Sequence, residues 1–452
     1  MKREMTTDMT KGNIFKHIIM FAIPLIIGNI FQQFYSMVDT LIVGRTIGMS
    51  ALAAVGATGS LAFLVNGFTI GLANGFAVMV SQRFGAGDMK GVRKSIAMGG
   101  MLSIAFAIII TALSVTFTMN ILELMNTPED IIRDSYLYIV TIFWGIPAVM
   151  VYNYMSSIVR ALGDSKTPLY FLLIASVLNI ILDYVCILAF DMGVMGAGVA
   201  TVFSQAISGI LCLIYVANKM PEICPKKEDW RFETKLALKH IQLGVPMGVQ
   251  LSVIASGSIV VQAMLNGFGT VAIAGFTTAA KIEMMISQIM ISFGLTLATF
   301  TGQNYGARNV SRIREGVRKT TIIMMIWSVI GALLLMFFGK WLTMMFIDSN
   351  EKSINDVVNY SYEYLMIMAT FFPALSCIFI FRNVLQGIGN AMTVLAGSIL
   401  ELFGRLAGAF VMAEFFGYTG LCFAGPCAWL IAAIFFIIMY IINMKKLKKS
   451  FA

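Results

Sequence analysis

Long apolar runs separated by short polar segments make up most of the chain. Each run can cross roughly 30 Å of hydrocarbon as a helix of about 20 residues. Twelve runs can be marked, at residues 16–43, 51–80, 95–118, 134–159, 167–190, 194–218, 238–266, 271–300, 320–347, 356–385, 391–413 and 418–443. The pattern predicts an all-α integral membrane protein with twelve transmembrane helices.

A repeat divides these runs into two sets of six. One motif follows the second run of each set, as Gln82-Arg83-Phe84-Gly85-Ala86 and as Gln303-Asn304-Tyr305-Gly306-Ala307. Five further pairs of identical residues recur at nearly the same spacing: Pro24 with Pro246, Gly48 with Gly269, Tyr136 with Tyr362, Pro147 with Pro373 and Gly163 with Gly389. An even number of spans per copy places both copies the same way up, related by a pseudo-twofold axis along the membrane normal. We expect an N-lobe at 1–218, a cytoplasmic linker at 219–237 and a C-lobe with a basic tail at 238–452.

Composition and charge placement agree with a membrane protein. Hydrophobic residues make up 58% and charged residues 12% of 452, against roughly 25% charged in soluble domains. Of the 32 Lys and Arg residues, 25 fall on the side of the N-terminus and four on the opposite side. By the positive-inside rule both termini are expected in the cytoplasm. The lysines and arginines expected on the cytoplasmic side of the membrane account for the net charge of +9. A nucleic-acid partner is therefore not expected.

Signatures of enzymes are missing from the sequence. We find no phosphate-binding lysine loop, no zinc-binding helix motif and no nucleophile elbow. The six cysteines have no metal-type spacing. We therefore predict that the protein is not an enzyme and has no cofactor, and no metal beyond a possible Na⁺.

Polar side chains inside the spans remain to carry function, because ionisable groups at membrane depth are costly unless paired or hydrated. In the first half, Asp39 shares one helix face with Tyr35 and Gln32 because of their helical spacing. Asp183 lies one turn after Asn179 in the fifth predicted span.

Neighbouring spans add Thr201 with Gln205, four residues apart, and Tyr138 and Asn153. Two carboxylates with an amide and a hydroxyl suit Na⁺ or one proton shared between the acids. The alternative is that Asp39 marks the aqueous boundary and Asp183 forms only a local hydrogen bond.

The second half carries a different polar set. Lys281 and Glu283 lie in one span, and Glu401 precedes Arg405 by four residues in another, the spacing of an intrahelical ion pair. This set either holds the lobe together or takes part in coupling. Arg382 is close enough to the cytoplasmic end of its span for its side chain to extend there.

Prolines and glycines suggest how the spans bend and pack. Pro24 and Pro246 occupy the same place in the two copies, where proline removes a helical hydrogen bond and favours a kink. We predict a hinge at each. Gly67, Gly71 and Gly75, four apart, would let their helix pack closely against another.

Four features together resemble the multidrug and toxic compound extrusion (MATE) transporters. They are Pro24 with Asp39, residues 81–88 (SQRFGAGD), residues 160–168 (RALGDSKTP) and residues 178–183 (LNIILD). The resemblance implies two six-helix lobes around a central cleft that opens alternately to either side. It also implies a cation site at Asp39, Asn179, Asp183 and Thr201, with Gln32, Tyr35 and Asn153 at substrate-cavity positions near it. We assign Tyr138 and Gln205 to the same expected cavity because they are polar residues within the neighbouring spans.

The chain departs from one branch of that family. NorM-like members place a glutamate eight residues after the proline of helix seven, where this chain has Ile254, and an acid deep in helix ten, where it has none. The pattern is closer to the DinF-like branch, with coupling in the N-lobe.

The function expected from the resemblance is efflux of amphipathic or cationic small molecules, driven by inward Na⁺ or H⁺. We expect a monomer in the cytoplasmic (inner) membrane of a prokaryote. The alternative is a flippase for a lipid-linked precursor from the same superfamily.

Overall fold

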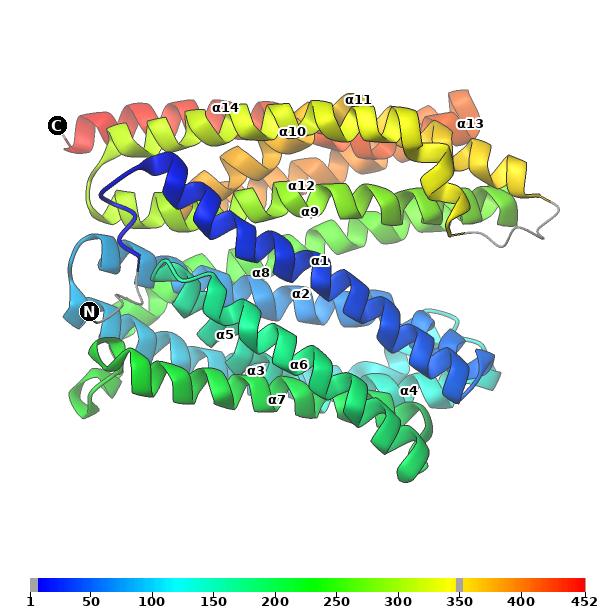
Figure 1. Ribbon diagram of the computed structural model, residues 1–452, viewed down its shortest axis with the longest axis horizontal. Coiled ribbons are helices and arrows are strands. Elements are labelled where there is room, and N and C mark those ends of the chain that lie inside the picture. Colours follow the sequence, from blue (N-terminus) through cyan, green and yellow to red (C-terminus); the bar gives the residue numbers. More distant parts are fainter. Residues whose placement is uncertain (1–6, 347–352, 452) are drawn as a thin grey trace. The chain divides into compact units, whose positions relative to one another are not determined.

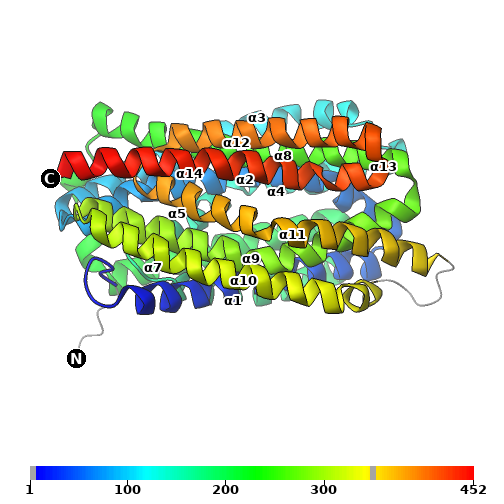
Figure 2. The ribbon, with the colours of Figure 1, turned by 90° about the horizontal axis from the view of Figure 1, so that it is seen from above.

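The computed structural model describes residues 7–346 and 353–451, and within them regular structure is helical throughout. Eleven helices are long and apolar enough to span a membrane, and a bent pair of shorter helices brings the total to twelve within the described residues. The prediction of an all-α membrane protein with twelve spans is therefore confirmed. Figures 1 and 2 show the chain as long helices joined by short connections.

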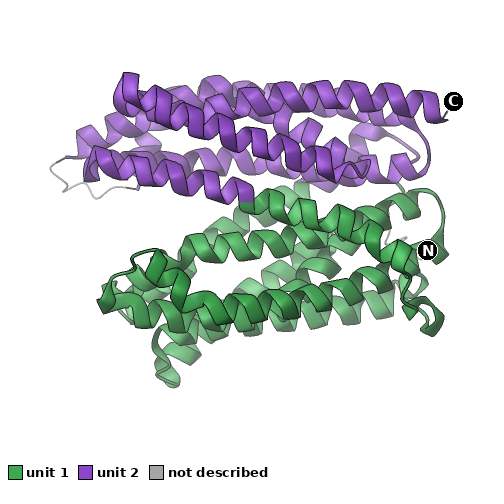
Figure 3. Cartoon of the chain, turned by 180° about the vertical axis from the view of Figure 1, so that it is seen from behind, with its two compact units in different colours: residues 1–9, 23–252 green, residues 10–22, 253–452 purple. Residues whose placement is uncertain are grey.

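The chain forms two compact units, which are shown in different colours in Figure 3. Unit 1 holds residues 7–9 and Ile23–Ser252, and unit 2 holds Thr10–Ala22 with the described residues from Val253 onward. Two helices are shared, since α1 (Ile14–Thr46) begins in unit 2 and α8 (Thr234–Leu265) begins in unit 1. Residues 10–22, expected in the N-lobe, thus belong to unit 2, whereas residues 238–252, expected in the C-lobe, belong to unit 1 together with the linker at 219–237.

Unit 1 contains the second part of α1 and the first part of α8, together with the helices between them. These are α2 (Met49–Gly85), α3 (Met89–Leu124), α4 (Glu129–Trp144), α5 (Ile146–Ala161), α6 (Lys166–Tyr184) and α7 (Gly193–Lys219). Helix α2 packs on α3, α4 and α5, and α7 packs on α4, α5 and α6. A π-helical turn, η1 (Val185–Ala189), prolongs α6 and begins two residues after Asp183.

Unit 2 contains α9 (Thr270–Gly306), α10 (Val310–Met344), α11 (Ile354–Gly387), α12 (Ala391–Ala407), α13 (Ala413–Cys422) and α14 (Ala424–Phe451). Helix α11 packs on α9, α10 and α14, and α14 also packs on α12. A second π-helical turn, η5 (Gly408–Met412), follows α12. Helix α13 is kinked at Gly417, which has a non-helical backbone with a φ of 58°.

One predicted span consists of two helices in the structure. The run at 134–159 predicts one helix, but the structure has α4 and α5, which meet at Gly145 with a bend of 48°. A β-carbon on Gly145 would lie 2.2 Å from a methyl group of Val202 in α7. The absence of a side chain at residue 145 therefore lets α7 approach the bend.

The small-residue face predicted on α2 is confirmed. A β-carbon on Gly71 would lie 2.3 Å from the carbonyl oxygen of Met247, and one on Gly75 would lie 2.5 Å from the Cα of Gly244. Glycines on both helices therefore bring the backbones of α2 and α8 into contact inside unit 1.

The linker after α7 is held against unit 1 by ion pairs. The Nε atom of Arg93 in α3 donates to Asp229 over 3.1 Å, and the Asp229 side chain is fully buried. The backbone N–H of Lys226 donates to the same carboxylate over 2.9 Å, and Lys94 pairs with Glu233. Burial acts to raise the pKa of Asp229, but these hydrogen bonds outweigh it, so the pKa lies below its ordinary value.

An Asp229→Asn variant is expected to be less stable at pH 7 by about 1–2 kcal/mol, because a charge-assisted bond is lost. The lowered pKa means that this contribution is present above the pKa of the unfolded chain, about 3.9, and is lost as the pH falls through the folded value. Thermal unfolding of both proteins in detergent at pH 7, 5 and 3 measures how the difference in stability between them shrinks as the pH falls. Glu228→Gln, an exposed neighbour, is the control, and an Asp229→Asn deficit as large at pH 3 as at pH 7 would contradict the argument.

Candidate functional site

The first-half polar residues converge near the end of α1 in unit 1. Asp39 lies in the last turns of α1, Asn179 and Asp183 lie on one face of α6, and Thr201 lies in α7. Helix α7 can approach because Gly198 packs against the backbone of Tyr138 in α4, where a β-carbon would be 3.2 Å from its carbonyl oxygen. Side chains from four helices therefore meet in one place.

Asn179 is the centre of this group and is fully buried. With its amide nitrogen toward the acids, Asn179 donates to Asp183 Oδ2 over 3.1 Å and to the Tyr35 hydroxyl over 3.0 Å. Its oxygen then accepts from the Thr201 hydroxyl over 3.3 Å and from the Thr201 N–H over 3.1 Å. In the reverse orientation the nitrogen donates to the Thr201 hydroxyl over 3.3 Å instead, so only the first orientation satisfies both ends of the amide.

The two carboxyl groups lie within hydrogen-bonding reach of each other. Asp183 is fully buried. The Oδ1 atoms of Asp39 and Asp183 are both buried and have no hydrogen-bond partner in the described part of the chain. Two carboxylates in contact cannot both be charged without a proton or cation between them. The pair can therefore hold one such ion.

An apolar cluster borders the acids. Ile42 and Val43, from the turn of α1 after Asp39, pack with Ile187 of η1 and with Val194 and Ala197 of α7. The ring of Tyr138 packs against the same cluster. These contacts keep the end of α1 next to α6 and α7, because separating them would expose apolar surface.

The other candidate cavity residues are placed differently. The Gln205 side-chain oxygen is buried and, among the described residues, without a hydrogen-bond partner. Gln32 is exposed and Asn153 is half-buried, and no hydrogen bond joins either to the acids within residues 7–346 and 353–451. The structure therefore groups Tyr35 and Tyr138 with the acids, but not Gln32 or Asn153.

One partly buried polar cluster of unit 1 is not predicted from the sequence. Arg160 in α5 donates to Ser157, and Ser157 donates to Asn74 in α2, both over 2.9 Å. Asn74 is a polar residue inside an apolar run, and that signal could have identified it. From the sequence, Arg160 enters only as part of the motif at residues 160–168.

Arg382, Glu401 and Arg405 form a partly buried charged cluster in unit 2. Arg405 Nη2 donates to Glu401 Oε1 over 3.3 Å, and Arg382 Nη1 lies 4.0 Å from Glu401 Oε2. Glu283 accepts a hydrogen bond from Ser287 over 2.6 Å, and Lys281 is exposed. The predicted intrahelical pair of Glu401 and Arg405 is confirmed. The expectation for Arg382 is wrong, because its side chain is buried beside Glu401 instead of extending outward.

Comparisons with known proteins cover nearly the whole chain. A family profile described as MatE matches residues 24–185 and 246–411. The chain is 30% identical over 403 residues to the probable multidrug resistance protein YpnP of Bacillus subtilis, covering 87% of each. It is 22% identical over 441 residues to the multidrug export protein MepA of Staphylococcus saprophyticus, covering 96% of this chain and 95% of the relative.

Solved structures agree on the fold. A multidrug resistance MATE family transporter of the MOP superfamily, in an outward-facing conformation, matches with a TM-score of 0.91 and 21% identity. The match covers 98% of this chain and 99% of that one. At this identity the likeness shows the fold, in which twelve transmembrane helices form two lobes.

Proposed function

Since this chain belongs to the MATE family, we propose that it is a secondary active multidrug efflux transporter that exchanges Na⁺ or H⁺ for amphipathic or cationic compounds. It would act as a transporter and not as an enzyme. The observation that carries the proposal is the contact between the Asp39 and Asp183 carboxyl groups. A site that must take up one positive charge is what an ion-coupled exporter requires.

The coupling step would be neutralisation of this acid pair. A proton on one carboxyl would be shared with the other, with Asn179 donating to Asp183. With the amide reversed, Na⁺ would instead meet oxygens from Asp39, Asp183, Asn179 and Thr201, a ligand set that suits a hard cation. Either ion removes the charge that holds a cationic substrate, so ion binding from outside would favour substrate release.

The energy available is sufficient to drive this exchange. One elementary charge crossing about 100 mV supplies roughly 2.3 kcal/mol, before any concentration gradient is added. Pro24 and Pro246 lie inside α1 and α8, the two helices that pass from one unit to the other. We propose them as the hinges on which the alternation depends.

The remaining assignments follow from the family and the charge pattern. We propose a monomer in the inner membrane of a prokaryote, with both termini and the linker in the cytoplasm, consistent with bacterial relatives. The absence of a glutamate at Ile254 supports the DinF-like pattern with coupling in the first half. A lipid-linked precursor flippase is less well supported, because the buried group in unit 1 is acidic.

Purified protein in liposomes tests this function. Efflux of a cationic dye is followed after imposing a Na⁺ gradient alone and then a pH gradient alone, with an imposed K⁺ diffusion potential as the control. We expect one of the two ion gradients to drive dye movement. Dye movement under neither gradient would contradict ion-coupled export, and lipid scrambling in the same vesicles would favour the flippase.

A further inference from the structure

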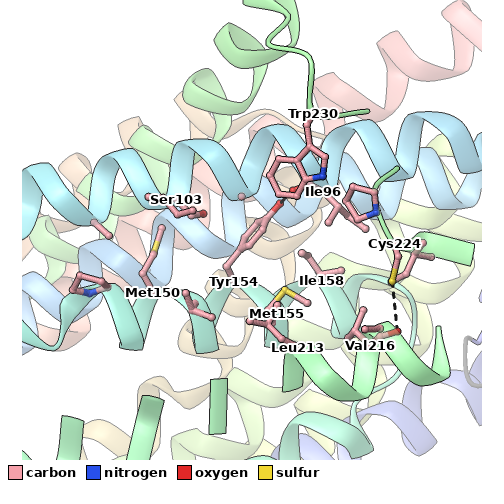
Figure 4. Close-up of a pocket in the computed structure, with 18 of the residues that line it drawn as sticks. Ile96, Ser103, Met150, Tyr154, Met155, Ile158, Leu213, Val216, Cys224 and Trp230 are labelled. Atoms are coloured by element: carbon pink, nitrogen blue, oxygen red, sulfur yellow. Dashed lines mark hydrogen bonds between the residues drawn. The ribbon is translucent and has the colours of Figure 1, made fainter. Parts of the chain in front are cut away.

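An apolar groove lies on unit 1, away from the acid pair. It has a volume of about 330 Å³ and is formed by α3, α5 and α7, with the linker after α7 closing one end (Figure 4). Ile104 and Gly100 of α3, Met150 and Tyr154 of α5, Leu213 of α7 and Trp230 of the linker are among its lining residues. The volume is at the lower end of the range for small-molecule sites.

The lining offers almost nothing to a polar ligand. The Tyr154 hydroxyl donates to the carbonyl oxygen of Ile96 over 2.9 Å. The Cys224 thiol lies against the carbonyl oxygen of Val216 at 3.7 Å, the contact that is dashed in Figure 4. The hydroxyl of Ser103 is buried within the lining. Because two of these three groups already have acceptors, the groove suits a hydrocarbon chain and not an ion or a polar solute.

The groove is continuous with the exposed apolar face of α3. Ile104 and Ile108, which line it, are 57% and 60% exposed. Leu113 and Phe117 continue the same stripe along α3 and are also exposed. In a transmembrane helix such a stripe faces lipid tails, so a tail can enter the groove sideways from the bilayer.

The linker end of the groove carries unpaired positive charge. Pro225 lines the groove and is followed by exposed Lys226 and Lys227, and Lys90 at the start of α3 is exposed as well. No ion pair involves these three ammonium groups among the described residues. The nearby acids Asp229 and Glu233 are paired with Arg93 and Lys94, and the exposed Glu222 and Glu228 reduce but do not cancel the charge of the three lysines. Trp230, half-exposed at this end, is the residue type that occurs at the membrane–water boundary.

We infer that this groove binds one acyl chain of an anionic phospholipid from the leaflet on the linker side, with the phosphate near Lys226 and Lys227. The tail would lie along α3 between Tyr154 and Trp230. Clusters of lysine next to a transmembrane helix attract anionic headgroups, and the groove adds a fixed place for the tail. The bound lipid would hold the linker against unit 1, in addition to the Arg93–Asp229 ion pair.

Gly100 allows a direct test of the tail site. A β-carbon there would be 3.8 Å from the ring of Tyr154 and 4.0 Å from the ring of Trp230, so Gly100→Phe fits only by filling the groove. Native mass spectrometry of the full-length protein, supplied with phosphatidylglycerol or phosphatidylcholine, measures lipid retention. We expect Gly100→Phe to weaken retention of one phosphatidylglycerol about tenfold, which corresponds to losing the burial of about two methylene groups.

The matched control is Leu113→Phe, on the same lipid-facing stripe of α3 but outside the groove. It should retain phosphatidylglycerol as the unaltered protein does. Equal retention by Gly100→Phe and Leu113→Phe would overturn the proposal. So would loss of binding of a hydrophobic dye with no loss of phospholipid, because the groove would then be a substrate site.

Surface lysines test the headgroup without altering packing. Lys226→Gln with Lys227→Gln should reduce retention of phosphatidylglycerol to that of phosphatidylcholine, whereas Lys448→Gln with Lys449→Gln at the C-terminal end should not. An unaltered protein that retains the two lipids equally would overturn the anionic preference. Both double variants change exposed residues, so the test does not depend on Gly100→Phe folding.

Discussion

Replacing either Asp39 or Asp183 with asparagine is expected to abolish ion-driven efflux, leaving only the leak of protein-free vesicles. Asparagine keeps the shape of the side chain but cannot share a proton with the other acid or supply a carboxylate to Na⁺. In each variant the remaining carboxyl group, whose Oδ1 atom is buried, would lie beside a neutral amide instead of a second acid. The site would then no longer need a proton or a cation between two carboxylates. The measurement is the initial rate of dye efflux from liposomes under the gradient that drives the unaltered protein.

The control for this pair is Asp130→Asn, an exposed acid in the first turn of α4. It should transport at the unaltered rate. Each variant is also checked for insertion and for a single elution peak in detergent, so that loss of transport is not confused with loss of fold. Normal gradient-driven efflux by both Asp39→Asn and Asp183→Asn would exclude the acid pair as the coupling site.

Gly71→Val is expected to destabilise the protein by at least about 1–3 kcal/mol, the range for overpacking of a core. Its β-carbon would lie 2.3 Å from the Met247 carbonyl oxygen and 2.6 Å from the Cα of Gly248. These are backbone atoms of α8, so no rotation of a side chain can relieve the contact. The temperature of unfolding in detergent and the fraction of monodisperse protein report the effect.

Gly56 and Gly59 provide matched controls on the same helix. A β-carbon at either position would meet no atom within 4 Å, so valine there changes only helix propensity, by a few tenths of a kcal/mol. Similar losses of stability for Gly71→Val and Gly56→Val would show that the close approach of α2 and α8 contributes little.

Repeat landmarks were the most predictive part of the sequence, because they mark backbone geometry. Gly48 and Gly269 both precede a helix with φ of 119° and 85°, and Gly163 and Gly389 have φ of 88° and 86°. These values favour glycine. The paired positions therefore correspond in conformation as well as in spacing.

The repeated loops also use equivalent helix caps. Asp88 accepts a hydrogen bond from the Gly91 N–H over 2.8 Å, and Asn309 accepts one from the Arg312 N–H over 3.1 Å. Both are favoured N-cap residues. The residue before each cap has positive φ, a glycine in the first copy and Arg308, with φ of 56°, in the second. The spacing predicted the turn, although the residue type differs.

The candidate acids could be recognised from the sequence because charge inside an apolar run is rare. The contact between the two acids could not be predicted from the sequence, because it depends on packing between α1, α6 and α7. The bend at Gly145 was missed for a similar reason. Pro147, at the start of α5, favours a break there because proline removes a helical hydrogen bond. The equivalent proline of the second copy, Pro373, lies inside the continuous helix α11, so a proline alone does not decide whether the span bends. The close contact of Gly145 with Val202 of α7 is the additional feature of the first copy.

Because α1 and α8 each belong partly to both units, the chain cannot be divided between the two sequence repeats without separating residues that pack together. A polypeptide ending before α8 would lack residues 234–252, whose backbone covers Gly71 and Gly75. Residues 10–22 would in turn be separated from the unit with which they pack. We therefore expect that neither sequence repeat folds on its own, because each compact unit includes a segment from the other half of the sequence.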